Sequence, residues 1–397
     1  MLFIVTTLLL GSIWATKLFP FLPLLPFLFV TREQIRSNNI VHTPIKPFLL
    51  FFIPVALSAL SITWSIAPDA SIDRTLKIAP LFILGGFLLC QMPNILNHFN
   101  KDENDTKYLS FLLGILIFLT TTLAIEHHFN MPIMRFLTQD YDAPFSIHHY
   151  NKCSAMLTLS SPPIIWAGLK ERQTPLLIIL ALSSFAMFLT LQSQSAQLAI
   201  IIGLIACFIP WSWRLFHWGI FLNISLFSLL SPYIFTYLFK FSHNIDQLQW
   251  SSHASIAARI EIGDAVSNYI FNSPLWGHGI EATNNITDFV MSYMYQTMKF
   301  SHPHNASLQI WIEFGLLGYI IFIAVLYLFF RKILQTYKGT SLNLAFTMIC
   351  MWFSLASTGY GLWHGWWIAL MIFNTMLFQI MTHMFLSNET ASQTSKN

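Results

Sequence analysis

Long apolar segments recur along the whole chain, and they constrain its fold more than any other feature. Several approach the ~20 residues that an α-helix needs to cross a bilayer. They lie near residues 2–30, 46–66, 75–91, 108–126, 153–168, 174–192, 195–210, 214–239, 306–330, 341–358 and 363–386. Only 9% of the 397 residues are charged, against roughly a quarter in soluble domains. The chain therefore requires lipid as its solvent, and we expect an all-α polytopic integral membrane protein.

The number of spans depends on the first apolar segment, 2–30, whose three prolines permit either one tilted helix or a broken hairpin. We therefore expect eleven or twelve transmembrane helices in a single membrane domain, 1–397, with one long outer loop, 240–305, that contains interfacial helices. The N-terminus has no basic region ahead of its apolar run, so we expect no cleaved signal peptide.

Basic residues collect in one alternating set of connections, and this asymmetry predicts the orientation of the chain. That set consists of 31–46, 92–107, 169–174, 210–217, 331–338 and the C-terminal tail. It holds 12 of the 20 Lys and Arg but 6 of the 17 Asp and Glu, a net charge of +6 against −3 on the other side. We expect the basic side to face the cytoplasm and the loop 240–305 to face the periplasm across a bacterial inner membrane. No basic run supports nucleic-acid binding.

A polar stripe begins where the loop 240–305 meets the next apolar segment, in "SHPHNASLQIWIEFGLLG". Asn305, Gln309 and Glu313 are spaced by four residues and so share one face of a helix, with Asn305 as its N-cap. Glu313 then lies about 12 Å below the cap, where an ionisable group is costly unless it faces a cavity or a partner. We interpret the stripe as part of a site.

Two histidines, His302 and His304, stand at the mouth of this predicted helix. A histidine there can serve as a general base, because its pKa lies near the operating pH. The His-x-His spacing could also hold a metal ion, but the chain has no HExxH motif and no convincing third ligand. We therefore expect no metal.

Three further polar groups fall on the same predicted side. Arg259 lies in "SIAARIEIGDAVSNYIFNSPLWGHG", whose apolar face predicts an amphipathic helix along the interface, although a snorkelling arginine is an equal alternative. Arg74 lies at the outer end of an early segment, where it either contacts a phosphate or anchors the helix at the headgroups. Gln194 belongs to a polar cluster, 192–197, that is most simply a turn between two spans.

Together these residues resemble the O-antigen ligase family, within the larger group that includes O-antigen polymerases. The similar segments extend from about residue 60 to 370, and they are "TWSIAPDASIDR", "HHYNKCSAMLTL", Arg259 followed by "SPLWGHG", "HPHNASLQIWIEFGLLG" and "STGYGLWHGWW". The His-Asn motif with its trailing Leu-Gln and Glu-x-Gly is the most specific of them.

The resemblance implies a membrane glycosyltransferase of lipopolysaccharide biosynthesis that uses no metal, nucleotide or other cofactor. Its donor would be a glycan on undecaprenyl diphosphate, and its acceptor would be the lipid A–core oligosaccharide. His304 matches the family's histidine, and Arg259 matches an arginine expected to bind the donor diphosphate, with Arg74 as a second contact. The residues expected to support them are His302, Asn305, Gln309, Glu313 and Gln194.

One departure from the family concerns Gln194, which stands where ligases often carry an arginine. Arg74, Arg135 or Lys152 could compensate for the missing charge. Two other functions also stay open: an O-antigen polymerase, which uses a second lipid-linked glycan as acceptor, and a transporter or flippase. Internal repeats and broken helices typical of transporters are not visible in the sequence.

Overall fold

The structure is a computed structural model, and it describes residues 20, 45–96, 105–129, 132–138, 148–190, 193–209, 213–244, 254–289 and 300–386. Every regular element in these ranges is helical, which confirms the all-α class. The elements are α3 (Ile45–Leu49), α4 (Phe52–Ser61), η2 (Ile62–Trp64), α5 (Pro68–Leu96), α6 (Asp105–His128), α7 (Pro132–Thr138), α8 (His148–Lys170), α9 (Thr174–Thr190), α10 (Gln194–Cys207), α11 (Arg214–Asn244), α12 (Ala254–Ile270), α13 (Ala282–Asn285), α14 (Ala306–Thr336), α15 (Gly339–Thr358), α16 (Gly365–Met381) and a π-helical turn (Thr382–Leu386).

Seven described helical segments are long and apolar enough to cross a membrane, which confirms a polytopic membrane protein. They are Pro47–Trp64, Pro68–Leu96, Asp105–His128, Leu215–Ser242, Ala306–Thr336, Gly339–Thr358 and Gly365–Phe385. Two shorter apolar helices, α9 and α10, and the 23-residue helix α8 occupy other predicted spans. The first predicted segment, 2–30, lies outside the described residues apart from Pro20, so the count of eleven or twelve stays a prediction.

The helices carry large apolar side chains on the outside and polar side chains within. Along α9, Leu182, Phe185 and Leu189 are 66%, 61% and 66% exposed. Ser160 and Asn374 are buried by contrast, and the serine donates a hydrogen bond to the amide oxygen at 2.8 Å. A hydrocarbon solvent favours this arrangement, because polar groups must find partners inside the protein while apolar side chains need no cover. The surface thus supports membrane burial independently of helix length.

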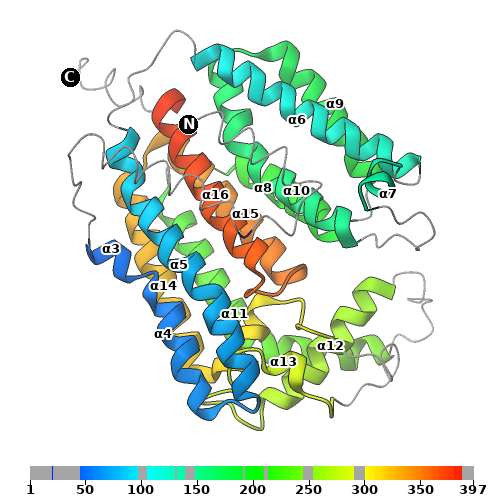
Figure 1. Ribbon diagram of the computed structural model, residues 1–397, viewed down its shortest axis with the longest axis vertical. Helices are drawn as coiled ribbons and strands as arrows, with labels where there is room; N and C mark the ends of the chain where they lie inside the picture. Colours follow the sequence, from blue (N-terminus) through cyan, green and yellow to red (C-terminus); the bar gives the residue numbers. More distant parts are fainter. Residues whose placement is uncertain are drawn as a thin grey trace.

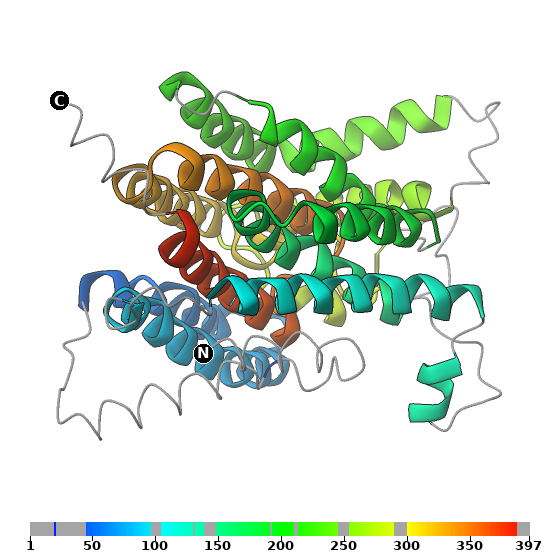
Figure 2. The same cartoon turned by 90° about the horizontal axis from the view of Figure 1, so that it is seen from above.

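The helices pack as a bundle in which α8 lies centrally (Figure 1). α6 packs along α9, α10 along α15, α5 along α16 and α4, and α11 against α12 and α14, while α8 contacts α6, α10, α15 and α16. Seen from above, the long helices lie side by side (Figure 2). Leu88, Leu112, Phe346 and Leu377 belong to the large central core and are fully buried. This packing brings the start of α14 and the end of α15 together, where the predicted site residues gather.

Candidate active site

A tight turn at residues 300–305 holds two histidines at the start of α14. Asn305 has an extended backbone, and its side-chain oxygen accepts a hydrogen bond from the Leu308 N–H at 3.0 Å, so it is the N-cap as predicted. His304 has a φ of 54°, a left-handed conformation that costs about 1–3 kcal/mol in a residue other than glycine. Its backbone N–H donates to Nδ1 of His302 at 3.2 Å. The local strain therefore falls on the residue that the sequence predicts to be the base.

The ring of His304 is oriented by the turn that follows α15. Its Nδ1 lies 2.9 Å from the carbonyl oxygen of Gly359. A carbonyl oxygen only accepts, so Nδ1 carries the hydrogen, and in the neutral ring Nε2 carries the lone pair. This contact selects the tautomer that a general base at Nε2 needs.

His302 lies against His304 and stays uncharged. The two ring centroids are 4.1 Å apart. Burial lowers the pKa of His302 well below its ordinary value, and the positive charges of His304, His364 and Arg259 lower it further. Near neutral pH the His302 ring is therefore neutral, and its unprotonated Nδ1 can continue to accept the His304 N–H.

A third histidine, His364, completes the cluster from the start of α16. Its ring centroid lies 5.2 Å from that of His302. Burial lowers the pKa of His364 to about 4, and the charges of Arg74 and Lys152 act in the same direction. Within the described ranges, no three His, Cys, Asp or Glu side chains are grouped so that they could hold a metal ion. The three rings thus form a compact group beside several cations, and two of them, His302 and His364, are neutral near pH 7.

Arg259 reaches this cluster from α12. The buried face of α12 includes Ile262, Val266 and Ile270, and it packs on α11 and α14. The helix that the sequence predicts around Arg259 is present. Arg259 is half-buried and lies close enough to lower the pKa of His302.

Tyr360 gives a second indication of where Arg259 lies. Burial raises the pKa of the Tyr360 hydroxyl, and the charge of Arg259 opposes that rise. Arg259 therefore acts on both the 300–305 turn and the turn 359–364. The structure places the predicted base and the predicted diphosphate-binding arginine in one neighbourhood.

The polar stripe on α14 forms as predicted, and its upper members are tied to protein groups. Asn305 donates through Nδ2 to the carbonyl oxygen of Ser357 at 3.0 Å. Gln309 accepts from the Leu362 N–H at 2.8 Å and donates to Glu313 at 3.1 Å. The stripe therefore fastens α14 to the turn 359–364 that orients His304.

Glu313 is the deepest member of the stripe and is 1% exposed. One carboxylate oxygen accepts from the indole N–H of Trp363. The other accepts from Gln309 and from the backbone N–H of Glu281 at 3.3 Å. Three chain segments, α14, the stretch at Glu281 and the turn 359–364, meet at this one carboxyl, which gives it a supporting position beneath the histidines.

Below Glu313 the helix is interrupted, and a distant segment fills the gap. Gly315 has a φ of 59° and a ψ of −151°. The segment 274–279 lies against 312–317, and we call this pairing the interlock. Its backbone bonds run from Leu316 N–H to Pro274 O at 2.8 Å, from His278 N–H to Ile312 O at 2.8 Å, and from Gly279 N–H to Glu313 O at 2.9 Å.

Glycine is required on both sides of the interlock. A Cβ on Gly315 would lie 2.5 Å from the carbonyl carbon of Leu275, and one on Gly277 would lie 2.5 Å from that of Glu313. Both glycines also have positive φ, which other residues adopt only at a cost. The "SPLWGHG" and "IEFGLLG" motifs therefore belong together because each closes on the backbone of the other.

Arg74 is held in an ion pair. Its Nε and one terminal nitrogen each lie 2.7 Å from a carboxylate oxygen of Glu281, and its other terminal nitrogen donates to the carbonyl oxygen of Trp363 at 3.2 Å. Glu281 itself has a φ of 67°. The Arg74 side chain thus lies at the site, where it makes a bidentate ion pair with the Glu281 carboxylate. Its contact with a phosphate stays a prediction.

The helices α8 and α10 also begin here, beside the end of α15 and the turn 359–364 that follows it. Ser195 donates to the carbonyl oxygen of Thr358 at 2.8 Å, and Tyr360 donates to that of Asn151 at 2.6 Å. Gln194 precedes Ser195 and so belongs to the same end of α10. The predicted polar cluster is therefore joined to the site rather than forming an isolated turn.

The two other cations considered as replacements for an arginine at Gln194 differ in position. Lys152 follows Asn151 on α8, and its charge lowers the pKa of His364, so it belongs to the site. Arg135 lies on α7, which Figure 1 shows beside the ends of α6 and α9. Lys152 is the better placed of the two.

Sequence reasoning missed His364, Glu281 and Trp363 as members of the site. The segment "STGYGLWHGWW" carried a signal for two of them, since a histidine again stands among aromatic residues at the end of an apolar segment. No sequence signal marked Glu281, because its partner Arg74 is 207 residues away in the chain. Its part in the site depends on the fold.

These observations define a polytopic membrane protein with a histidine–arginine site at one end of its bundle. The O-antigen ligase family model matches residues 178–323, which include Gln194, Arg259, His304 and the interlock. A candidate polysaccharide ligase of Rickettsia bellii is 24% identical over 359 residues, covering 88% of this chain and 83% of the relative. One of Rickettsia felis is 24% identical over 347 residues, covering 85% and 80%. The matches confirm the resemblance to the O-antigen ligase family. No solved structure matches the chain.

Proposed function

We propose that the chain is a glycosyltransferase that moves a glycan from undecaprenyl diphosphate to lipid A–core at the periplasmic face of the bacterial inner membrane. The family match supports a ligase-type activity, and the distribution of Lys and Arg supports the orientation. The observation that carries the chemistry is the 2.9 Å contact of His304 Nδ1 with Gly359 O, beside Arg259.

In this proposal Nε2 of His304 takes the proton from the acceptor hydroxyl as its oxygen attacks the anomeric carbon of the donor. The bond from that carbon to the diphosphate breaks, and its electron pair leaves with undecaprenyl diphosphate. Arg259 binds the departing diphosphate, because a guanidinium fork suits two phosphate oxygens. A fixed cation at a partly dry site stabilises developing charge more than water does.

Arg74 and Lys152 would complete the diphosphate site. The guanidinium of Arg74 is already bound by the carboxylate of Glu281, in the bidentate geometry that a phosphate would use. A phosphate of the donor would therefore have to displace that carboxylate. Lys152 would compensate for the glutamine at 194 as a point charge. The donor is activated before it crosses the membrane, so the mechanism as proposed calls on neither nucleotide nor metal.

The function is tested by deleting the gene in its native strain and separating the lipopolysaccharide on a gel. A lost ligase leaves lipid A–core bare while full-length polymer remains on the carrier lipid. Plasmid-borne wild-type protein should restore the polymer ladder. A band of core bearing a single repeat unit would instead identify a polymerase and refute the proposed acceptor.

The orientation is tested with two single cysteines in a variant that lacks the four native ones. Thr287 and Thr336 are both exposed, and they lie on opposite predicted sides. A membrane-impermeant thiol reagent should label Thr287→Cys in intact spheroplasts and label Thr336→Cys only after lysis. The reverse pattern would place the histidines in the cytoplasm and end the proposed mechanism.

A further inference from the structure

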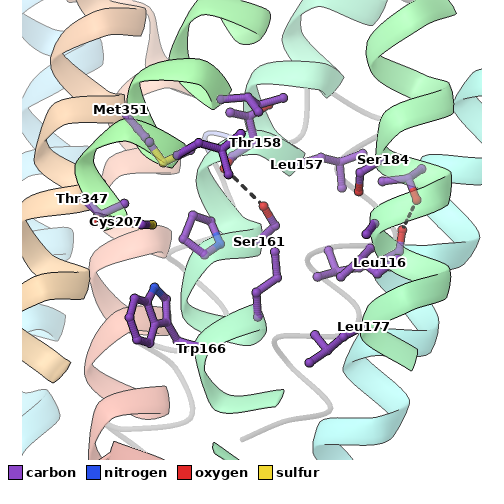
Figure 3. A pocket seen from close by; sticks show the side chains of 18 of the residues that line it. Leu116, Leu157, Thr158, Ser161, Trp166, Leu177, Ser184, Cys207, Thr347 and Met351 are labelled. Atoms are coloured by element: carbon purple, nitrogen blue, oxygen red, sulfur yellow. Dashed lines mark hydrogen bonds between the residues drawn. The ribbon is translucent and has the colours of Figure 1, made fainter. Parts of the chain in front are cut away.

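A mostly apolar pocket of about 320 Å³ lies between helices of the bundle (Figure 3). Its walls come from five helices, α6, α8, α9, α10 and α15. Leu157 and Met351 line its upper part, while Trp166 and Leu177 line its lower part (Figure 3). The volume falls at the lower end of the range for small-molecule sites, and the lining suits a hydrocarbon.

The pocket begins directly beneath the candidate active site. α8, α10 and α15 all meet the turn 359–364 at their upper ends. Along α8, Leu157 lies about 9 Å from Asn151, which contacts that turn. Along α10, Cys207 lies about 18 Å from Ser195. A chain in the pocket would therefore run from the site down into the membrane.

The pocket also reaches the outer surface of the bundle. Leu169 and Leu204 line it, and each is 58% exposed. Its walls belong to helix pairs that pack separately, α6 along α9 and α10 along α15, with α8 between them. A space of this size loses van der Waals contacts unless hydrocarbon fills it. A lipid chain can thus enter sideways from the bilayer while its polar end stays at the site.

We infer that this pocket binds the part of the donor's prenyl chain that adjoins the diphosphate. The inference rests on the proposed function for the identity of the donor. In the donor, the chain is joined to the reacting carbon through the diphosphate alone, so it must begin beside Arg259 and Lys152. In the acceptor, the core sugars separate the attacking hydroxyl from the acyl chains of lipid A. The donor is therefore the substrate whose hydrocarbon must lie beneath the cations.

The inference is tested by photo-crosslinking the full-length protein in phospholipid vesicles that contain undecaprenyl diphosphate. A benzophenone amino acid at Ser184 would face the pocket, which that residue lines. The same group at Ala186, an exposed position two residues further along α9, is the matched control. We expect adducts with the mass of the prenyl diphosphate at 184 in clear excess over 186. Adducts with phospholipid alone at 184, or equal prenyl labelling at both positions, would overturn the inference.

A pocket-filling substitution gives a second readout. Ser184→Phe should raise the KM for the lipid-linked donor about tenfold, which corresponds to about two methylene groups kept from burial, and should leave kcat within about twofold. Ala186→Phe should change neither constant, and equal effects of the two substitutions would count against the pocket.

Failure of the inference and failure of the proposed function can be told apart. A protein that transfers glycan normally but crosslinks only phospholipid at 184 keeps its function and refutes the prenyl site. Prenyl adducts at 184 in a protein that transfers nothing would support the site and refute the function.

Discussion

The histidine cluster (His302, His304 and His364) and the interlock lie at either end of the first turns of α14, but they differ in how their polar groups are used. In the cluster, all three histidines are half-buried, and the charge of Arg259 acts on His302 while those of Arg74 and Lys152 act on His364. In the interlock, backbone groups of the two segments bond to one another, and the Glu313 carboxyl above it is buried and accepts hydrogen bonds from protein groups alone. In the proposed function, the first region meets the substrate and the second holds the first in place.

The difference shows why an intramembrane carboxyl need not be catalytic. The depth of Glu313 in the predicted membrane helix indicated a site, yet its two carboxylate oxygens accept hydrogen bonds from Trp363, Gln309 and Glu281. A buried group with this many donors is stabilised where it is. His304 lies less deeply and is strained, which is more typical of a working residue. Substitutions at Glu313 should therefore change mainly the stability of the protein, whereas substitutions at His304 should change mainly the rate of transfer.

Apart from the loss of His304 itself, the largest effect on transfer should come from the arginine beside the histidine cluster. Arg259→Ala should lower transfer about 10²–10³-fold, the usual cost of removing one donor to developing charge, with little change in thermal stability. Arg259→Lys should also be damaging, because a point charge does not replace a bidentate fork. The measurement is transfer from a lipid-linked glycan at matched amounts of folded protein. Full activity of the lysine variant would reduce the role to local positive charge.

A smaller effect, on stability alone, should follow from filling the interlock. Gly315→Ala adds a methyl group 2.5 Å from the Leu275 carbonyl carbon at a positive φ, so we expect a loss of about 1–3 kcal/mol or more in unfolding free energy. Gly114→Ala is the matched control, because a Cβ there meets nothing within 4 Å and alanine favours a helix. Thermal unfolding in detergent measures both. Equal midpoints for the two variants would show that the interlock tolerates a side chain.

Periodicity and capping predicted the local parts of this account. The start of α14 at Ala306, the cap at Asn305, the stripe below it and the helix around Arg259 all follow from patterns within about ten residues. Each depends on contacts that a single helix makes with itself or with one apolar neighbour. Such features can therefore be predicted from a short stretch of sequence.

The parts that escaped sequence analysis depend on contacts between distant segments. The break at Gly315 exists because residues 274–279 supply the hydrogen bonds that the helix gives up. The fork of Arg74 closes on Glu281, and His364 joins from a turn 60 residues beyond His304. Motifs showed that these segments matter, but only the packing of α5, α14 and α16 shows which residues meet.

The most direct test compares His304→Ala with Glu313→Gln, measuring kcat and the unfolding midpoint of each purified variant. His304→Ala should lower kcat about 10²–10⁴-fold and leave the midpoint near that of the wild type. Glu313→Gln should lower the midpoint, because an amide cannot accept all the hydrogen bonds that now reach the carboxylate, and should keep kcat within about tenfold of the wild type for the folded fraction. Near-normal turnover of His304→Ala, or an equal loss in Glu313→Gln at unchanged stability, would contradict the assignment of His304 as the base.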